Sequence, residues 1–170
     1  MSELADIAIT IAPETPLQDE VRVFIKELNA YLSALSPPEF CFQMTAAQIA
    51  ETATTLFVAR DATGRAVGMG ALKRHADGIA EVKRMYTRPE LRGQHIGRAI
   101  LNRIEALARS EGFTRLVLET GIEKTHRESW RLYERNGFVP CGVVLDYPDS
   151  GWNAFFEKPL GGFVKRSGQD

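Results

Sequence analysis

The segment 79–120 most constrains the fold, because two extended stretches flank one helical stretch. The alternation within 79–87 and the leucine-rich composition of 115–120 predict two strands. Isoleucines at every fourth position predict a helix over 96–110 between them. Strands joined through a helix pair in parallel with a right-handed crossover, so the sheet must contain at least one parallel pair.

Short strands separated by turn-forming residues precede that helix. The segments 56–60, 66–74 and 79–87 predict an antiparallel meander, with turns at 61–65 and 75–78. The remaining predicted elements are a strand at 5–12, helices from Thr15 to Leu35, from Thr45 and over 125–138, and strands within 138–147 and 151–160. This order predicts an α+β fold, with a central twisted mixed sheet of about seven strands flanked by four helices.

The helix over 96–110 begins without the side-chain cap that the other helices carry. Capping boxes are predicted at Thr15–Gln18, Thr45–Gln48 and Thr125–Glu128. The helix over 96–110 instead follows the sequence Arg92-Gly93-Gln94-His95-Ile96-Gly97. Its free N–H groups carry the positive end of the helix dipole, and Arg92 and Arg98 add charge beside them. We expect a bound anion as the cap, with a solvated helix end as the alternative. The glycine spacing fits neither a Walker loop nor a Rossmann fingerprint.

The same loop resembles the acetyl-CoA loop of the GNAT (GCN5-related) N-acetyltransferase superfamily, written [QR]-x-x-G-x-[GA]. His95 stands here at the first motif glycine. The stretch "SWRLYERNGF" (129–138) resembles a later helix of that family, and the element order is similar over about residues 5–160. The resemblance implies one GNAT domain over 1–170, with 161–170 fraying as a tail and the fourth and fifth strands splayed apart.

The resemblance also implies a binding site for acetyl-CoA. Arg92 is the motif's basic first residue. The pyrophosphate would be held by backbone N–H groups of the loop, those of Gly93, Gln94, His95, Ile96, Gly97 and Arg98. The pantetheine arm would lie against the backbone of Met85, Tyr86 and Thr87. His95 is a departure that either weakens binding, contacts a phosphate through its ring, or contributes only its amide.

Two side chains are expected to carry the chemistry. Tyr133 occupies the family's position for the proton donor to the departing thiolate, with a core tyrosine as the alternative. Glu81 is the expected general base, Glu119 is the alternative, and either carboxylate could instead form a salt bridge with a neighbouring Lys83 or Arg84. His126 replaces an asparagine that many members carry, and we expect it on the surface of a helix's first turn, with a part in a proton path as the alternative.

Strand periodicity assigns these residues to faces. Simple alternation places Glu81, Lys83 and Met85 on one face and the residues between them on the other. The basic pairs 73–74 and 83–84 lie on neighbouring strands, so they either favour an acceptor that carries a carboxylate or form a solvated face. The family resemblance implies that the segment 31–44 covers the acceptor groove; the alternative is that its apolar residues only fill the core.

Composition narrows the function. A net charge of −1 gives no general attraction to nucleic acid or to an anionic membrane. The N-terminus has no signal-type core, and Cys41 and Cys141 form no metal or redox motif, so we expect a cytoplasmic protein with reduced thiols and no metal.

The sequence therefore predicts an acetyl-CoA-dependent N-acetyltransferase that acts on a small-molecule or protein amine, with direct attack in a ternary complex. Its alternatives are a non-catalytic CoA-binding module and an acyltransferase for longer acyl groups. A homodimer is left open, as is the identity of the acceptor.

Overall fold

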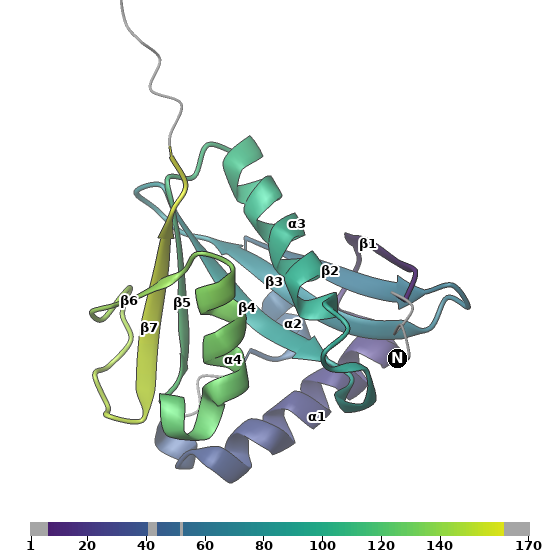
Figure 1. The fold of residues 1–170 in the computed structure, drawn as a ribbon, viewed down its shortest axis with the longest axis horizontal. Helices are drawn as coiled ribbons and strands as arrows, with labels where there is room; N and C mark the ends of the chain where they lie inside the picture. The colour runs from purple at the N-terminus through teal and green to yellow at the C-terminus, as the bar shows by residue number, and fades with distance from the viewer. Residues whose placement is uncertain (1–6, 41–43, 52, 162–170) are drawn as a thin grey trace, which may run out of the picture.

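The computed structural model describes residues 7–40, 44–51 and 53–161. In these residues seven strands form one sheet, in the order β1-β2-β3-β4-β5-β7-β6 (Figure 1). The strands are β1 (Ile9–Pro13), β2 (Thr54–Asp61), β3 (Ala66–Arg74), β4 (Ile79–Thr87), β5 (Arg115–Gly121), β6 (Val139–Cys141) and β7 (Asn153–Pro159). The helices are α1 (Asp19–Leu35), α2 (Ala46–Glu51), α3 (Ile96–Ser110) and α4 (Glu123–Arg135), with short 3₁₀ turns at Pro38–Phe40 and Pro89–Leu91. The predicted α+β class and mixed sheet are confirmed, whereas the tail 162–170 lies outside the described residues.

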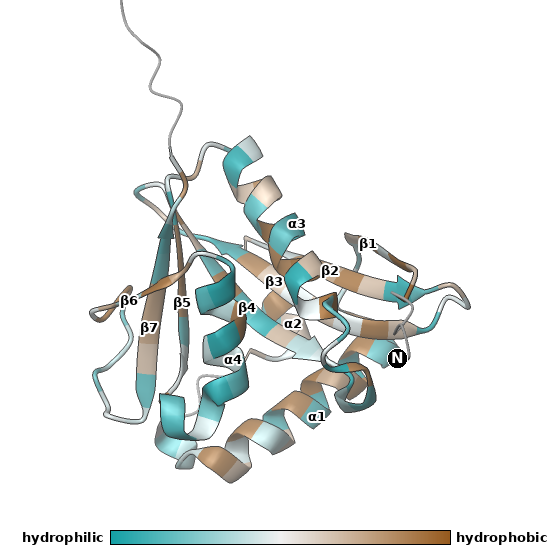
Figure 2. Cartoon of the chain, in the orientation of Figure 1, coloured by the Kyte–Doolittle hydropathy of each residue, from teal (hydrophilic) through white to brown (hydrophobic). Residues whose placement is uncertain are grey.

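The helices cover both faces of the sheet. Helices α3 and α4 pack on one face, and α1 and α2 pack on the other (Figure 1). Ile96, Ile100 and Ile104 of α3 are buried against the sheet, as their spacing predicts, while the outer sides of α3 and α4 are largely hydrophilic (Figure 2). The two faces therefore have separate apolar cores.

The sheet opens between its fourth and fifth strands. Strand β4 pairs with β5 in parallel only over residues 79–81 and 115–117. Beyond this point the two strands separate, while β4 continues its antiparallel pairing with β3 as far as Thr87. The splay expected from the family resemblance is thus confirmed, and it leaves one edge of β4 unpaired.

A bulge in β4 overturns the simple alternation. The register with β3 shifts between Met69 and Ala71, and Arg84 takes a positive φ of 55°. Arg84 then reaches α1, where Nη2 donates to the Ile25 carbonyl oxygen at 3.5 Å. Met85 lies on the α3 side with Ile100 instead of sharing the face of Glu81. The prediction is wrong from Arg84 onward, because one extra residue reverses the facing of every later side chain.

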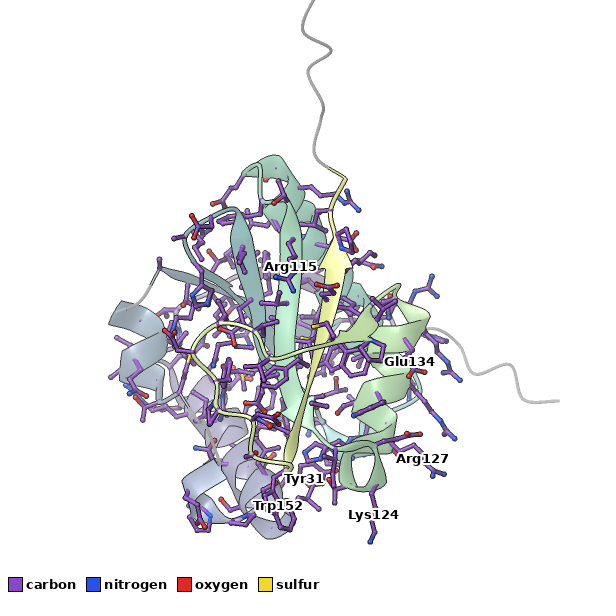
Figure 3. All side chains as sticks on the ribbon, turned by 90° about the vertical axis from the view of Figure 1, so that its left-hand side faces the viewer. Tyr31, Arg115, Lys124, Arg127, Glu134 and Trp152 are labelled. Carbon is purple, nitrogen blue, oxygen red and sulfur yellow. The ribbon has the colours of Figure 1, made fainter. Side chains whose placement is uncertain are left out.

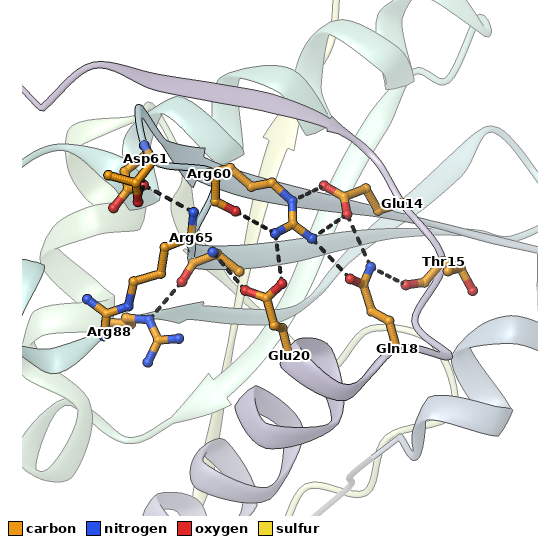
Figure 4. Close-up of polar contacts among 11 residues, drawn as sticks. Glu14, Thr15, Gln18, Glu20, Arg60, Asp61, Arg65 and Arg88 are labelled. Carbon is orange, nitrogen blue, oxygen red and sulfur yellow. Dashed lines mark hydrogen bonds and ion pairs between the residues drawn. The ribbon is translucent and has the colours of Figure 1, made fainter.

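The start of α1 is held by a distant arginine and not by the predicted capping box. The helix begins at Asp19, and its N-cap residue Gln18 makes no side-chain capping bond. Arg60 of β2 instead binds Glu14 and Gln18 at 2.8–3.0 Å and Glu20 at 2.9 Å (Figure 4). The same guanidinium lowers the pKa of both carboxyl groups. A network formed across the fold therefore replaces the local cap.

The other two capping boxes have opposite outcomes. The Thr45–Gln48 box forms, with reciprocal bonds of 2.8 and 3.1 Å. The box at Thr125 does not, because α4 begins two residues earlier, at Glu123, and the Thr125 hydroxyl donates to the Ile122 carbonyl. The strand predicted within 138–147 is also shorter, and only Val139–Cys141 pairs with β7.

Candidate active site

A cavity of about 1020 Å³ lies where β4 and β5 separate. The ends of both strands line it, together with the start of α3, one side of α4, the second half of α1 and the loop before β7. Tyr31 of α1 and Trp152 of that loop lie at the same end of the molecule, and both line the cavity (Figure 3). Tyr31, Leu32 and Ser36 of the segment 31–44 line this cavity, whereas residues 41–43 lie outside the described ranges.

The start of α3 forms one wall of the cavity. Its N-cap residue is His95, which takes the left-handed conformation with φ 63° and ψ 17°, and Gly93 before it has φ 83°. Histidine tolerates this region better than most residues, which explains how it replaces a motif glycine. Within the described residues no side chain caps the helix, so its first amides remain available to an anion.

Positive charge gathers around this helix end. The cavity wall includes six basic side chains from the loop, α3 and α4, namely Arg92, Arg98, Lys124, Arg127, Arg131 and Arg135. Lys124 and Arg127 project outward from the start of α4 (Figure 3). The Arg92 guanidinium lies over the Tyr31 ring at 5.7 Å and near Glu128 at 3.7 Å, so it is only partly neutralised. A Cβ added at Gly97 would make only ordinary contacts, the nearest 3.4 Å from Leu132, so packing within the chain does not itself require glycine there.

Two carboxyl groups meet on the other side of the cavity. Glu81 is buried, with Oε1 2.9 Å from His75 Nε2 and Oε2 accepting a 2.5 Å bond from the Tyr147 hydroxyl. Lys83 Nζ donates to that same hydroxyl at 2.7 Å and lies 3.5 Å from Glu81, so the ion pair named as the alternative for this carboxylate is present. Burial lowers the pKa of Lys83.

Glu119 lies at the end of β5 and lines the same cavity. Burial raises the pKa of its carboxyl group from 4.5 to about 7, against the opposing effect of the Lys83 charge. A carboxyl group with such a pKa can accept a proton near neutral pH.

Tyr133 of α4 also lines the cavity and is 7% exposed. Its ring packs against Phe138 and Phe156, with centroids 5.8 and 6.0 Å away. Burial, reinforced by the Glu119 charge, raises the pKa of its hydroxyl, so the group is protonated at neutral pH. The structure therefore brings Tyr133, Glu81, Glu119 and the start of α3 to one space.

Residues 22–138 match the profile of the acetyltransferase (GNAT) family. This chain belongs to the GNAT family. It is 40% identical over 153 residues to an IAA acetyltransferase of Azospirillum brasilense, a match that covers 89% of this chain and 98% of that protein. A crystal structure described as an acyl-CoA N-acyltransferase of Klebsiella pneumoniae is 32% identical with a TM-score of 0.75, covering 89% of this chain and 97% of the other. GNAT proteins are acetyl-CoA-dependent N-acetyltransferases, and this chain is one of them.

His126 occupies a different place in this GNAT chain from the one predicted. It is 6% exposed and has non-helical backbone angles inside α4. Its Nδ1 lies 2.8 Å from the Thr125 hydroxyl, and its ring covers Gly121 so closely that a Cβ there would lie 1.9 Å from Nδ1. Burial lowers the pKa of the ring. The surface prediction is wrong because the kink, which spacing alone does not reveal, turns this side chain inward.

The sequence analysis also missed a side chain that lies outside the GNAT motifs but bonds the charged residues of the cavity. Tyr147 was expected in a strand, yet it binds Glu81 and Lys83 from the loop between β6 and β7. Of the two basic pairs, only 83–84 borders the cavity, whereas Arg74 is held by Glu111 at 2.7 Å. The aromatic character of the segment around Tyr147 was the available signal.

In the described ranges no group of three or more His, Cys, Asp or Glu side chains is placed to hold a metal ion. Of the helices in those ranges, none has both the length and the apolar character needed to cross a bilayer.

Proposed function

We propose that this protein transfers the acetyl group of acetyl-CoA to a primary amine by direct attack in a ternary complex. One observation carries the proposal. A single cavity is lined by an uncapped, basic helix end, by a carboxyl group with a pKa of about 7 and by a protonated tyrosine. The first feature suits a diphosphate, and the other two suit proton transfer.

The start of α3 would hold the diphosphate of acetyl-CoA. The backbone amides of residues 93–98 form an uncapped turn, and Arg92 and Arg98 border it. The left-handed angles of Gly93 and His95 bend this turn around the helix axis, and Gly97 keeps side-chain bulk away from it. When bound, acetyl-CoA supplies an activated acetyl thioester.

The unpaired edge of β4 would hold the pantetheine arm. Tyr86 and Thr87 pair with β3 on one side, while β5 has already diverged on the other. The free backbone groups of Met85, Tyr86 and Thr87 therefore offer an extra-strand pairing surface. A backbone N–H on this edge would also polarise the acyl carbonyl oxygen.

Glu119 would accept the proton of the attacking amine. An alkyl ammonium group has a pKa of ~10.4, so a base must remove a proton before attack near neutral pH. The pKa of about 7 supports Glu119 in this role. Glu81, the base expected from the sequence, becomes the alternative, since its carboxylate is already shared by His75, Lys83 and Tyr147.

Tyr133 would donate a proton to the departing sulfur. Its raised pKa keeps the hydroxyl protonated until a stronger base arises beside it. The direct mechanism needs no acyl-enzyme, and Cys141, whose pKa is raised by burial, is poorly suited as a nucleophile. Because the A. brasilense relative is named an IAA acetyltransferase, the transfer assay should also include IAA beside the primary amines.

Thermal-shift titration and a transfer assay test this function together. Acetyl-CoA and CoA should raise the melting temperature, whereas ATP and NAD should not. Release of the CoA thiol should then depend on an added amine. Tyr133→Phe should lower kcat by about 100-fold while the shift with acetyl-CoA is unchanged.

Two outcomes would replace the proposal. Binding of acetyl-CoA without thiol release on any amine would favour the non-catalytic module. Faster transfer from a longer acyl-CoA than from acetyl-CoA would favour the alternative acyltransferase.

A further inference from the structure

Arg84 is a buried charge that has no counter-ion among the residues that the structure describes. The residue is 7% exposed, and it lines the cavity between β4 and α1. Its Nη2 donates to the Asn29 side-chain oxygen and the Ile25 carbonyl. Its Nε is fully buried and has no hydrogen-bond partner among the residues that the structure describes. No carboxylate within those residues forms an ion pair with it. Burial therefore lowers the pKa of the guanidinium to about 10 without an opposing charge.

A buried guanidinium without an ion-pair partner lowers the stability of the fold unless a bound anion compensates its charge. Buried charges in proteins are normally paired, because removing a charge from water is unfavourable without a partner. The other buried cation at this site, Lys83, has Glu81 at 3.5 Å. Arg84 therefore has the charge, the unused donor and the position in the cavity wall to receive an anion.

The surroundings of Arg84 define what would carry that anion. Leu28 and Leu32 of α1 line the same cavity, as does Trp152 of the loop before β7. Arg84 contacts α1 on one face of the sheet, whereas the wall formed by α3 lies on the opposite face. The anion is thus distinct from the phosphates assigned to that wall, and it accompanies an apolar group.

We propose that Arg84 binds the carboxylate of the acceptor, which is a free amino acid with an apolar side chain. This inference rests on the proposed acetyl transfer, because it assigns the acceptor for that reaction. A guanidinium recognises a carboxylate through charge-assisted hydrogen bonds, and the apolar wall would bury the side chain. The amine of such a molecule lies two bonds from its carboxylate carbon, so anchoring the carboxylate also positions the nucleophile.

A comparison of L-phenylalanine with L-phenylalaninamide tests the proposal. The two probes share the apolar body and the amine but differ in the carboxylate. In wild-type enzyme kcat/KM should be higher for the acid than for the amide. Arg84→Met should lower kcat/KM for the acid about 10- to 100-fold and leave the amide within about threefold. The ratio between variants cancels the different basicity of the two amines.

Matched variants separate binding from folding. Arg84→Lys keeps the charge and should retain part of the preference for the acid. Asn29→Asp places a carboxylate beside Arg84, so it should lower activity on the acid while raising the melting temperature. Arg22→Met, an exposed change elsewhere on α1, should alter neither substrate.

Each outcome of these experiments either supports or refutes the binding of the acceptor carboxylate by Arg84. Equal losses for acid and amide in Arg84→Met, or a wild-type enzyme that prefers the amide or a peptide beginning with phenylalanine, would overturn the proposal. If no amine is acetylated, calorimetric titration of L-phenylalanine into the CoA-saturated protein replaces the kinetic readout. Binding that is lost in Arg84→Met would then support the carboxylate site although the transfer reaction had failed, and absence of binding would refute it.

Discussion

Glu119→Gln gives a quantitative test of the assigned base, because it removes a titrating group without changing the shape of the side chain. The carboxyl group has a pKa of about 7 in the folded protein against an ordinary value of 4.5. Each tenfold difference in acid strength is worth about 1.4 kcal/mol, so ionised Glu119 costs the fold about 3 kcal/mol. Lys83 and Glu81 on β4, Tyr133 on α4 and Tyr147 are the charged or titratable groups that act on it.

The sign follows from the raised pKa. Below pH 4.5 the group is protonated in both the folded and the unfolded chain, and it imposes no cost. As the pH rises through about 7, the unfolded chain has already lost the proton, and stability falls until the folded group ionises too. Relative to wild type, Glu119→Gln should therefore gain about 3 kcal/mol of unfolding free energy between pH 4 and pH 8.

Enzyme activity should rise over the pH range in which the stability of the wild-type protein falls. In the wild-type enzyme kcat/KM should rise with pH through about 7, where Glu119 ionises. In Glu119→Gln that rise should vanish, and kcat/KM at pH 8 should fall about 100-fold or more. Urea unfolding across the pH range and thiol-release kinetics measure the two effects. Glu134→Gln, on the outer side of α4, is the matched control (Figure 3).

The reasoning would be refuted by either of two results. A stability difference between Glu119→Gln and wild type that stays constant from pH 4 to pH 8 would mean that the carboxyl group has its ordinary pKa. A pH limb that survives in Glu119→Gln and disappears in Glu81→Gln would assign the base to Glu81.

Three further changes probe the scaffold of the site. His95→Gly should raise the unfolding free energy by about 1 kcal/mol, because it relieves a left-handed backbone at a residue with a Cβ, and denaturant titration measures the gain. Gly121→Ala should lower it by about 1–3 kcal/mol, since the new Cβ would displace His126, whereas Gly142→Ala has open space and should be neutral. Tyr147→Phe should lower it by about 1–3 kcal/mol, because two buried charged groups lose a shared hydroxyl, and equal stability would show that water replaces it.

Local sequence patterns were sufficient to predict the bounds of elements that are separated by turns. The predicted bounds 66–74, 79–87 and 96–110 coincide with β3, β4 and α3. Gly64 and Gly78, with φ of 84° and 74°, lie in the turns just before β3 and β4, at positions that few other residues tolerate. Short-range sterics therefore set these bounds without help from the rest of the fold.

Longer-range contacts decided the places where prediction failed. The spacing of Thr15 and Gln18 matches a capping box, but Arg60 takes the Gln18 side-chain oxygen at 3.0 Å. Nothing in the local sequence reveals that a strand 42 residues away supplies this donor. The burial of His126 and Tyr147 likewise depends on how α4 kinks and where the β6–β7 loop lies, so their proximity to the cavity could not be predicted from their neighbours in the sequence.

The bulge at Arg84 connects the two halves of the site. Without it, regular alternation would point Arg84 toward α3 and Met85 toward α1. The left-handed turn at Arg84 brings its guanidinium against α1, at the acceptor side, and sends Met85 to the α3 side. The same local irregularity lies just beyond the last residue that pairs with β5, where the strands begin to separate. One residue with a positive φ therefore both presents the unmatched charge and accompanies the opening of the sheet, so a change that restored regular pairing in β4 would be expected to alter the acceptor side and the pantetheine side together.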